Sequence, residues 1–194
     1  MAGKRSDARQ KMVSAARELF REQGYHATAL SDVLKRSEAP RGSVYFHFPG
    51  GKAELAAEAA DEHTREQVEN IDRAAADATT AGDLVRAYLG LARTNLTASD
   101  YRQGCTIAPL VIESTSESDE LDAVGGRSFT MIIDALAGHF SAFGIEQSDA
   151  RLLAHAVLAG AEGALITARS LQSTAPFDAV QAALEAQVAT VQKK

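Results

Sequence analysis

The stretch GYHATALSDVLKRSEAPRGSVYFHFPGGKAEL, residues 24–55, decides how this chain of 194 residues is interpreted. It opens at Gly24, a residue suited to the left-handed position that follows a helix. Apolar residues at steps of three and four then predict a short helix after Thr28, whose side-chain oxygen can cap it. Pro40 suits the first turn of the next short helix, because the amide it lacks would be unpaired there anyway. Two short helices joined by residues 37–39 have the outline of a helix-turn-helix.

The second short helix is predicted to have an inward and an outward face. Val44 and Phe48 are its inward residues. A major groove accepts a helix whose first turn carries small side chains, and Gly42 and Ser43 meet this requirement. Arg41 can donate two hydrogen bonds to the O6 and N7 of guanine, or pair with a phosphate. The outward residues are therefore candidate DNA contacts: Arg41, Ser43, Tyr45 and His47.

Two neighbouring helix starts are suited to the DNA backbone. Thr28 and Ser31 lie at the start of the first short helix, and Lys52 lies at the start of the segment that follows. The free amides and the positive dipole end of a helix attract phosphate. We expect these three residues to contact phosphate groups.

At these residues the chain resembles the tetracycline-repressor (TetR) family, and particularly its LmrA/YxaF-like branch. The turn departs from the family pattern, since residues 37–40 read Ser-Glu-Ala-Pro where Ala-Gly-Val-Ser is common. Beyond the first 60 residues the likeness rests on the helical pattern and on Gly104-Cys105 followed by Glu113. The resemblance implies an all-helical fold, binding of double-stranded operator DNA, a variable lobe that binds a small-molecule effector, and a homodimer. It implies operator contacts at Thr28, Ser31, Arg41, Ser43, Tyr45, His47 and Lys52. Pro40 and Gly42, at the predicted start of the same short helix, complete the expected DNA-binding residues.

The remaining sequence predicts further helices and contains no alternating pattern typical of a strand. We expect an all-α chain of about nine helices: a DNA-binding domain over residues 1–56 and an effector-binding and dimerisation domain over 57–194. Besides the two short helices, the predicted ranges are Asp7–Gln23, Lys52–Ala76, Asp83–Ala98, Ile107–Ser114, Asp119–Phe143, Ser148–Gln172 and Pro176–Val191, with Ser148 as an N-cap.

Charge divides the chain in the same place as the motifs. Residues 1–56 hold 10 basic and 6 acidic residues, a net charge of +4, whereas the remainder holds 10 and 20, a net charge of −10; the sum is −6. Attraction to phosphate is local, so a basic head on an acidic body favours contact of the head with a nucleic acid. Chance clustering on a solvated face is the alternative that charge alone leaves open.

Two predictions concern the C-terminal part. Small and apolar residues at helical steps favour a helix–helix interface between two chains, at Ala156, Gly160, Gly163, Phe177, Val180, Leu184 and Val188. The alternative is that these stripes fill the core of a single chain. For an effector pocket the candidates are Tyr88, Asn95, Cys105, Phe129 and Glu162.

Other function classes find little support. No nucleophile or metalloprotease motif is present, the segment 49–52 lacks the residues of a phosphate loop, and His139 and His155 have no partner at metal-ligand spacing, so we expect neither an enzyme nor a cofactor or metal. The lone Cys105 is expected to be buried and inert rather than a redox sensor. No secretory signal or membrane span is expected, which favours a cytoplasmic protein. The competing hypothesis is an all-helical small-molecule binder or adaptor that does not bind DNA sequence-specifically.

Overall fold

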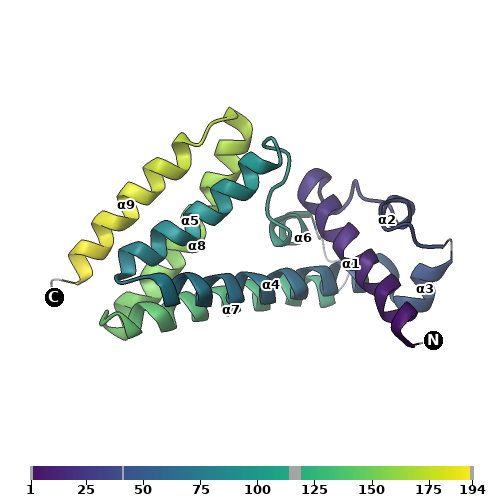
Figure 1. Ribbon diagram of the computed structural model, residues 1–194, viewed down its shortest axis with the longest axis horizontal. Coiled ribbons are helices and arrows are strands. Elements are labelled where there is room, and N and C mark those ends of the chain that lie inside the picture. Colours follow the sequence, from purple (N-terminus) through teal and green to yellow (C-terminus); the bar gives the residue numbers. More distant parts are fainter. Residues whose placement is uncertain (1, 41, 114–118, 193–194) are drawn as a thin grey trace. The chain divides into compact units, whose positions relative to one another are not determined.

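The computed structural model of the protein describes residues 2–40, 42–113 and 119–192. Within these ranges the chain forms nine α-helices and no strand, which confirms the expected all-α class (Figure 1). The helices are α1 (Ala2–Gln23), α2 (Leu30–Arg36), α3 (Ser43–His47), α4 (Gly51–Asp77), α5 (Ala81–Ala98), α6 (Ile107–Glu113), α7 (Asp119–Ala142), α8 (Gln147–Leu171) and α9 (Ala175–Val191).

The chain falls into two compact units. Unit 1 comprises Met1–Thr64 and Cys105–Ser128, and unit 2 comprises Arg65–Gly104 and Phe129–Lys194. The division therefore passes through α4 and α7, and it places α6 in the same unit as the first three helices. The sequence suggested a simpler arrangement, with a boundary at residue 56 and everything after it in one domain. In the structure, unit 1 also includes residues 57–64 and 105–128.

The core of unit 1 lies between α1 and the first half of α4. Met12, Phe20, Phe48 and Leu55 are almost fully buried. Ion pairs reinforce the packing, since Arg9 pairs with Glu58 and the Arg17 Nη1 lies 2.9 Å from the Glu62 Oε1, each joining α1 to α4. The short helices thus rest on the start of α4, because three helices of this size bury too little apolar surface alone.

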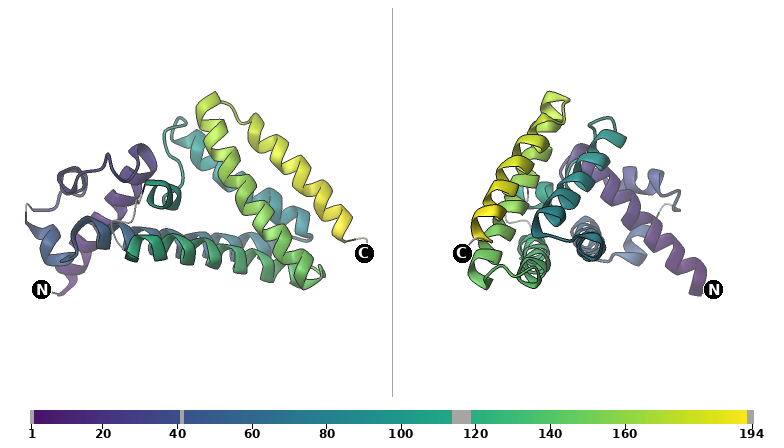
Figure 2. Two further views of the ribbon diagram at one scale, coloured as in Figure 1. Left: turned by 180° about the vertical axis from the view of Figure 1, so that it is seen from behind. Right: turned by 60° about the vertical axis from the view of Figure 1, so that its left-hand side comes forward.

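In unit 2, helices α5, α8 and α9 pack against one another, and α8 and α9 run antiparallel side by side (Figures 1 and 2). Their core includes Leu84, Leu153 and Phe177, all buried. Gly160 lets the two helices approach, because a Cβ at this position would lie 2.8 Å from the Val180 Cγ1. Length and composition would allow α8 to span a membrane, the one such helix in the described ranges, and in the structure one of its faces packs against α5 and α9.

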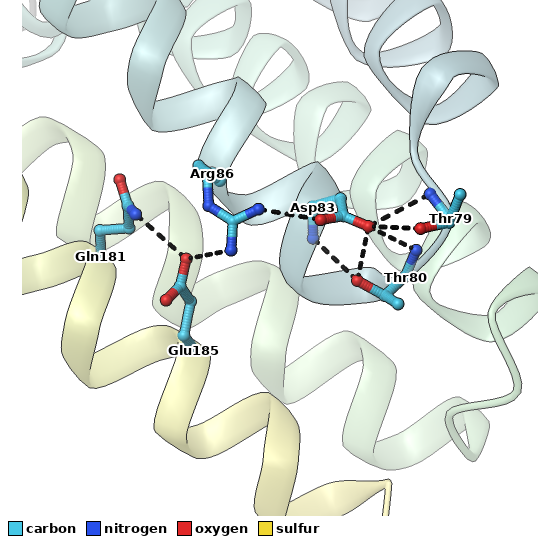
Figure 3. A network of polar contacts seen from close by, with 6 residues as sticks. All are labelled: Thr79, Thr80, Asp83, Arg86, Gln181 and Glu185. Atoms are coloured by element: carbon cyan, nitrogen blue, oxygen red, sulfur yellow. Dashed lines mark hydrogen bonds and ion pairs between the residues drawn. The ribbon is translucent and has the colours of Figure 1, made fainter.

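A polar network fixes the start of α5 and joins it to α9 (Figure 3). The Asp83 carboxylate accepts hydrogen bonds from the backbone amides of Thr79 and Thr80, at 3.2 and 2.9 Å, while the Thr80 hydroxyl accepts one from the Asp83 amide at 3.1 Å. Hydrogen bonds from Thr80, Thr79 and Arg86 lower the pKa of Asp83. Arg86 also lies 3.0 Å from the Glu185 carboxylate on α9. The predicted start of this helix at Asp83 is two residues late.

The predicted cap of α8 is wrong. Glu146, not Ser148, is the N-cap, and its carboxylate accepts the Ser148 amide at 2.9 Å. The Glu146 carboxylate, one position before the helix, can reach the free amides of the first turn. It therefore takes the capping role that was predicted for Ser148.

Candidate nucleic-acid interface

The turn between α2 and α3 is built around a left-handed residue. The Ser37 amide donates to the Val33 carbonyl at 2.8 Å, and the Ala39 amide donates to the Leu34 carbonyl at 3.1 Å, which ends α2. Glu38 between them has φ +55° and points into solvent. This is a conformation that favours glycine, the residue common at this position in the family, so the departure from the family pattern places a side chain in a strained backbone conformation.

Helix α3 begins later than the sequence suggested. Its first residue is Ser43, and Pro40 lies before it, outside the helix. Gly42 is the N-cap with φ +90°, and both the amide and the hydroxyl of Ser43 donate to the Pro40 carbonyl, at 3.1 and 2.7 Å. The prediction of Pro40 in the first turn is wrong because the left-handed Gly42 interrupts the helical backbone between them.

The faces of α3 agree with the prediction and add one residue to it. Val44 and Phe48 are buried, whereas the Tyr45 and Phe46 side chains are each 64% exposed. Pro40 and Gly42 are exposed too, and Ser43 and His47 are half-buried. Sequence reasoning missed Phe46. The residue could have been inferred from its place on a helix of five residues, of which Val44 alone is buried. Arg41, the residue expected to read guanine, lies outside the described residues.

Thr28 does not have the role that the sequence suggested. It is buried, and its hydroxyl donates to the Gly24 carbonyl at 2.7 Å. The N-cap of α2 is Ala29, whose amide donates to the Asp32 carboxylate at 3.2 Å. Thr28 therefore fixes the α1–α2 turn, and a phosphate contact through its side chain is not supported. Ser31 is exposed at the start of α2, as expected.

Lys52 lies in the first turn of α4 and is half-buried. Its ammonium donates to the His26 carbonyl at 3.4 Å and lies 4.2 Å from the centre of the Tyr25 ring. Both contacts tie the start of α4 to the α1–α2 turn. The ammonium group also lies at the N-terminus of a helix, where a phosphate would bind.

Part of the positive charge of the head is used inside the head itself. Arg36 lies 2.9 Å from Glu18 and 3.0 Å from Glu22, and Arg9 and Arg17 pair with carboxylates of α4. The net charge of +4 over residues 1–56 therefore overstates the positive charge that arginine side chains have available for phosphate groups.

Comparison with known proteins settles the family. A model of the bacterial regulatory proteins of the tetR family matches residues 12–59, and a model of the LmrA/YxaF-like transcriptional regulator C-terminal domain matches residues 81–183. The chain belongs to the tetR family. It is therefore a DNA-binding transcriptional regulator, in a family whose members generally respond to ligands.

Similar proteins agree with this TetR-family assignment. An uncharacterised HTH-type transcriptional regulator of Mycobacterium tuberculosis is 37% identical over 180 residues, covering 89% of each chain. The HTH-type transcriptional regulator LmrA of Bacillus subtilis is 28% identical over 174 residues, covering 88% of this chain and 91% of its own. The crystal structure of the regulatory protein TetR from Rhodobacter sphaeroides has a TM-score of 0.82 at 23% identity, covering 93% and 98% of the two chains, and shows the shared fold.

The predicted pocket residues of this TetR-family chain differ in how deeply they are buried. Tyr88 is buried, and Phe129 and Glu162 are half-buried, all in unit 2. Asn95 is exposed, which gives no support to its predicted place in a pocket, and the neighbouring Leu96 is the buried residue near the end of α5.

Cys105 belongs to unit 1 and is half-buried rather than buried. Its Sγ accepts the amides of Ile107 and Ala108, at 3.3 and 3.4 Å, at the start of α6. The thiol thus caps a helix, and a pocket role for it stays a prediction.

The dimerisation residues divide between two faces. Phe177, Leu184 and Val188 are buried within the single chain, and Val180 packs at Gly160. The alternative that these residues fill one chain's own core therefore accounts for them. Ala156 is half-buried, and Gly163 is exposed with open space around it. Helical periodicity located two packed stripes but could not tell which stripe meets a partner.

Proposed function

We propose that this TetR-family protein is a repressor that binds a palindromic operator as a homodimer and leaves it when a small-molecule effector binds. One observation carries the proposal: α3 buries Val44 and exposes Tyr45 and Phe46, two large aromatic side chains, to solvent. Contiguous exposed apolar surface marks an interaction site. In a helix-turn-helix of this family, the partner for that surface is the DNA major groove.

The chemistry of α3 suits both parts of a duplex. Gly42 and Ser43 keep its first turn small, so the helix can approach base edges closely. The Tyr45 hydroxyl and the His47 ring can donate to phosphate oxygens, which fixes the register on the duplex. The Phe46 ring has no polar atom and suits apolar contact with a thymine methyl group. Ser31 and Lys52 add phosphate contacts at two helix starts.

Dimerisation would use the outward face of α8 and α9. On α8 the exposed residues include Leu152 (64%) and Ile166 (58%), with Ala159 and Gly163 between them. On α9 the exposed residues include Ala175, Ala179, Ala182, Ala183, Ala186 and Ala189. Small residues let helices of two chains approach closely, and a two-fold axis would then set two α3 helices about 34–36 Å apart, one turn of DNA.

Release would follow from coupling between the C-terminal domain and the head. An effector that prefers a conformation with the wrong separation of the two α3 helices weakens operator binding, and a coupling of about 1–3 kcal/mol corresponds to roughly 5- to 150-fold. The role is non-enzymatic and cytoplasmic. The effector pocket is expected among the inward residues of unit 2, which include Tyr88.

Selection of duplexes tests the proposal. The full-length chain would be mixed with random duplexes and the retained fragments sequenced. We expect a palindromic consensus whose half-sites are about 10 base pairs apart. Retention of no preferred sequence would instead favour the small-molecule binder or adaptor, which predicts weak binding to any duplex.

Alanine variants locate the reading surface on the selected duplex. Tyr45→Ala and Phe46→Ala should each weaken binding by about tenfold or more, equivalent to about 1.4 kcal/mol or more. Met131→Ala is the matched control, since Met131 is also a large exposed apolar residue (49%) but lies on α7. Equal effects of all three variants would remove α3 from the interface.

A further inference from the structure

The end of α6 is fastened to the turn between α1 and α2. The Glu113 Oε2 accepts the backbone amide of His26 at 2.7 Å. In the opposite direction, the His26 Nε2 lies 2.6 Å from the Glu113 backbone oxygen. A carbonyl only accepts, so the ring must carry its proton on Nε2 and donate it. Two hydrogen bonds thus join the same two residues, 87 positions apart in the sequence.

Gly24 makes this contact possible. Its φ is +87°, and a Cβ at this position would collide with the Glu113 Oε1. The carboxylate therefore lies against the backbone of the turn, in space that any other residue would fill. A left-handed glycine and a close approach at the same position indicate a contact on which the local backbone depends.

The turn that Glu113 holds is connected to residues at the DNA surface. The Thr28 hydroxyl donates to the Gly24 carbonyl, which fixes the approach to α2. Lys52 donates to the His26 carbonyl and lies over the Tyr25 ring, which fixes the start of α4. Displacing His26 would therefore shift both helix starts that are suited to phosphate.

Glu113 also lies at a boundary between domains. It falls within residues 81–183, which match the C-terminal domain model, yet it lies in the same compact unit as the head. A residue of the effector-binding part of the sequence thus holds a turn of the DNA-binding part directly.

We propose that Glu113 is a positioning residue for DNA binding, which acts through the backbone and ring of His26 to hold the α1–α2 turn in the form that engages an operator. This inference rests on the proposed function. Through this contact, the C-terminal domain would position the helix-turn-helix directly, in addition to its connection through α4. A ligand that shifts the end of α6 would break both bonds together.

A pair of variants isolates the hydrogen bond from the charge. Glu113→Ala and Glu113→Gln both remove the same negative charge, but glutamine keeps an oxygen that can accept the His26 amide. The first measurement is hydrogen exchange of residues 24–29 in the full chain without DNA. We expect exchange at least tenfold faster in Glu113→Ala than in Glu113→Gln, with residues 84–96 of α5 unchanged.

The second measurement is affinity for the selected duplex. Glu113→Ala should bind about three- to tenfold more weakly than Glu113→Gln, and His26→Ala, which removes the ring bond from the other side, should weaken binding in the same direction. Equal exchange or equal affinity of the two Glu113 variants would overturn the proposal. If the wild-type chain prefers no duplex, the proposed function fails, while the exchange result still reports whether the contact holds the turn.

Discussion

At the scale of single residues, Glu38 occupies a position that the backbone reserves for glycine. Its φ is +55°, and a left-handed residue with a side chain costs about 1–2 kcal/mol. Glycine loses more chain entropy on folding, which offsets about half of that. We therefore expect Glu38→Gly to raise the free energy of unfolding by about 0.5–1 kcal/mol, measured by urea denaturation.

The same substitution on a regular helix gives the opposite sign. Glu69 is exposed on α4, where glycine is a poor helix former, so Glu69→Gly should lower the free energy of unfolding by about 0.5–1 kcal/mol. A lower stability for both variants would mean that the turn does not strain Glu38. A second effect belongs to function: loss of an acidic side chain beside α3 should tighten operator binding at low salt.

His63 makes stability depend on pH. Burial, followed by the charges of Arg17 and Arg21, lowers its pKa to about 3. The unfolded chain takes up a proton on His63 near pH 6.5, whereas the folded chain does not. The free energy of unfolding is therefore undiminished by His63 above pH 6.5, and it decreases as the pH falls from 6.5 toward 3.

The expected loss between pH 7.5 and 5.5 is about 1 kcal/mol from this residue. His63→Leu removes the titrating group, and the difference in slope between the two chains isolates its contribution from the other four histidines. Denaturation curves at the two pH values measure it. Identical slopes would show that His63 titrates normally in the folded chain.

At the scale of helices, most long elements could be predicted closely, whereas the helix-turn-helix could be predicted only in outline. Two helices depart from this pattern: α1 begins at Ala2, five residues before its predicted start at Asp7, and the short α6 begins at Ile107 as predicted. The predicted bounds of α4, α5, α7, α8 and α9 lie within two residues of those observed, because many apolar positions at helical spacing fix a long helix. The start of α3 depends on one backbone angle at Gly42, which no periodicity reports. Capping at Thr28 failed for a related reason: several polar side chains near a helix start compete for the same amides.

The start of α5 offers a test of capping that the structure makes specific. Thr80 has a side chain that accepts the Asp83 amide, so Thr80→Ala should lower the free energy of unfolding by about 1 kcal/mol. Thr94 lies inside the same helix and is exposed, so Thr94→Ala should leave stability unchanged or raise it slightly. Thermal unfolding of both variants separates the cap from the composition of the helix. A stability loss in Thr94→Ala as large as in Thr80→Ala would contradict it.

At the scale of the whole molecule, one part of the candidate site could be predicted from the sequence and another part could not. The outward residues of α3 could be inferred from one buried valine and one buried phenylalanine. The dimerisation face could not, because two packed stripes obey the same period, and only burial distinguishes Phe177, Leu184 and Val188 from Gly163. Periodicity placed Asn95 on the inward face of α5, whereas the structure buries the next residue, Leu96, and exposes Asn95.

Gly163 gives the assembly a direct test. It has open space around it in the single chain, so Gly163→Arg should leave the fold intact and convert the proposed dimer to a monomer. Gly138 on α7 is also exposed and open, and Gly138→Arg should remain dimeric. Sedimentation velocity at micromolar concentration measures both. A dimeric Gly163→Arg variant would place the interface elsewhere.

The central claim is that two copies of α3 read successive turns of one face of a duplex. The most direct measurement is the affinity for the selected operator before and after insertion of five base pairs between its half-sites, which rotates one half-site to the opposite face. We predict that the insertion reduces affinity by about a hundredfold or more, to the level of a single half-site. Unchanged affinity after the insertion would contradict the account.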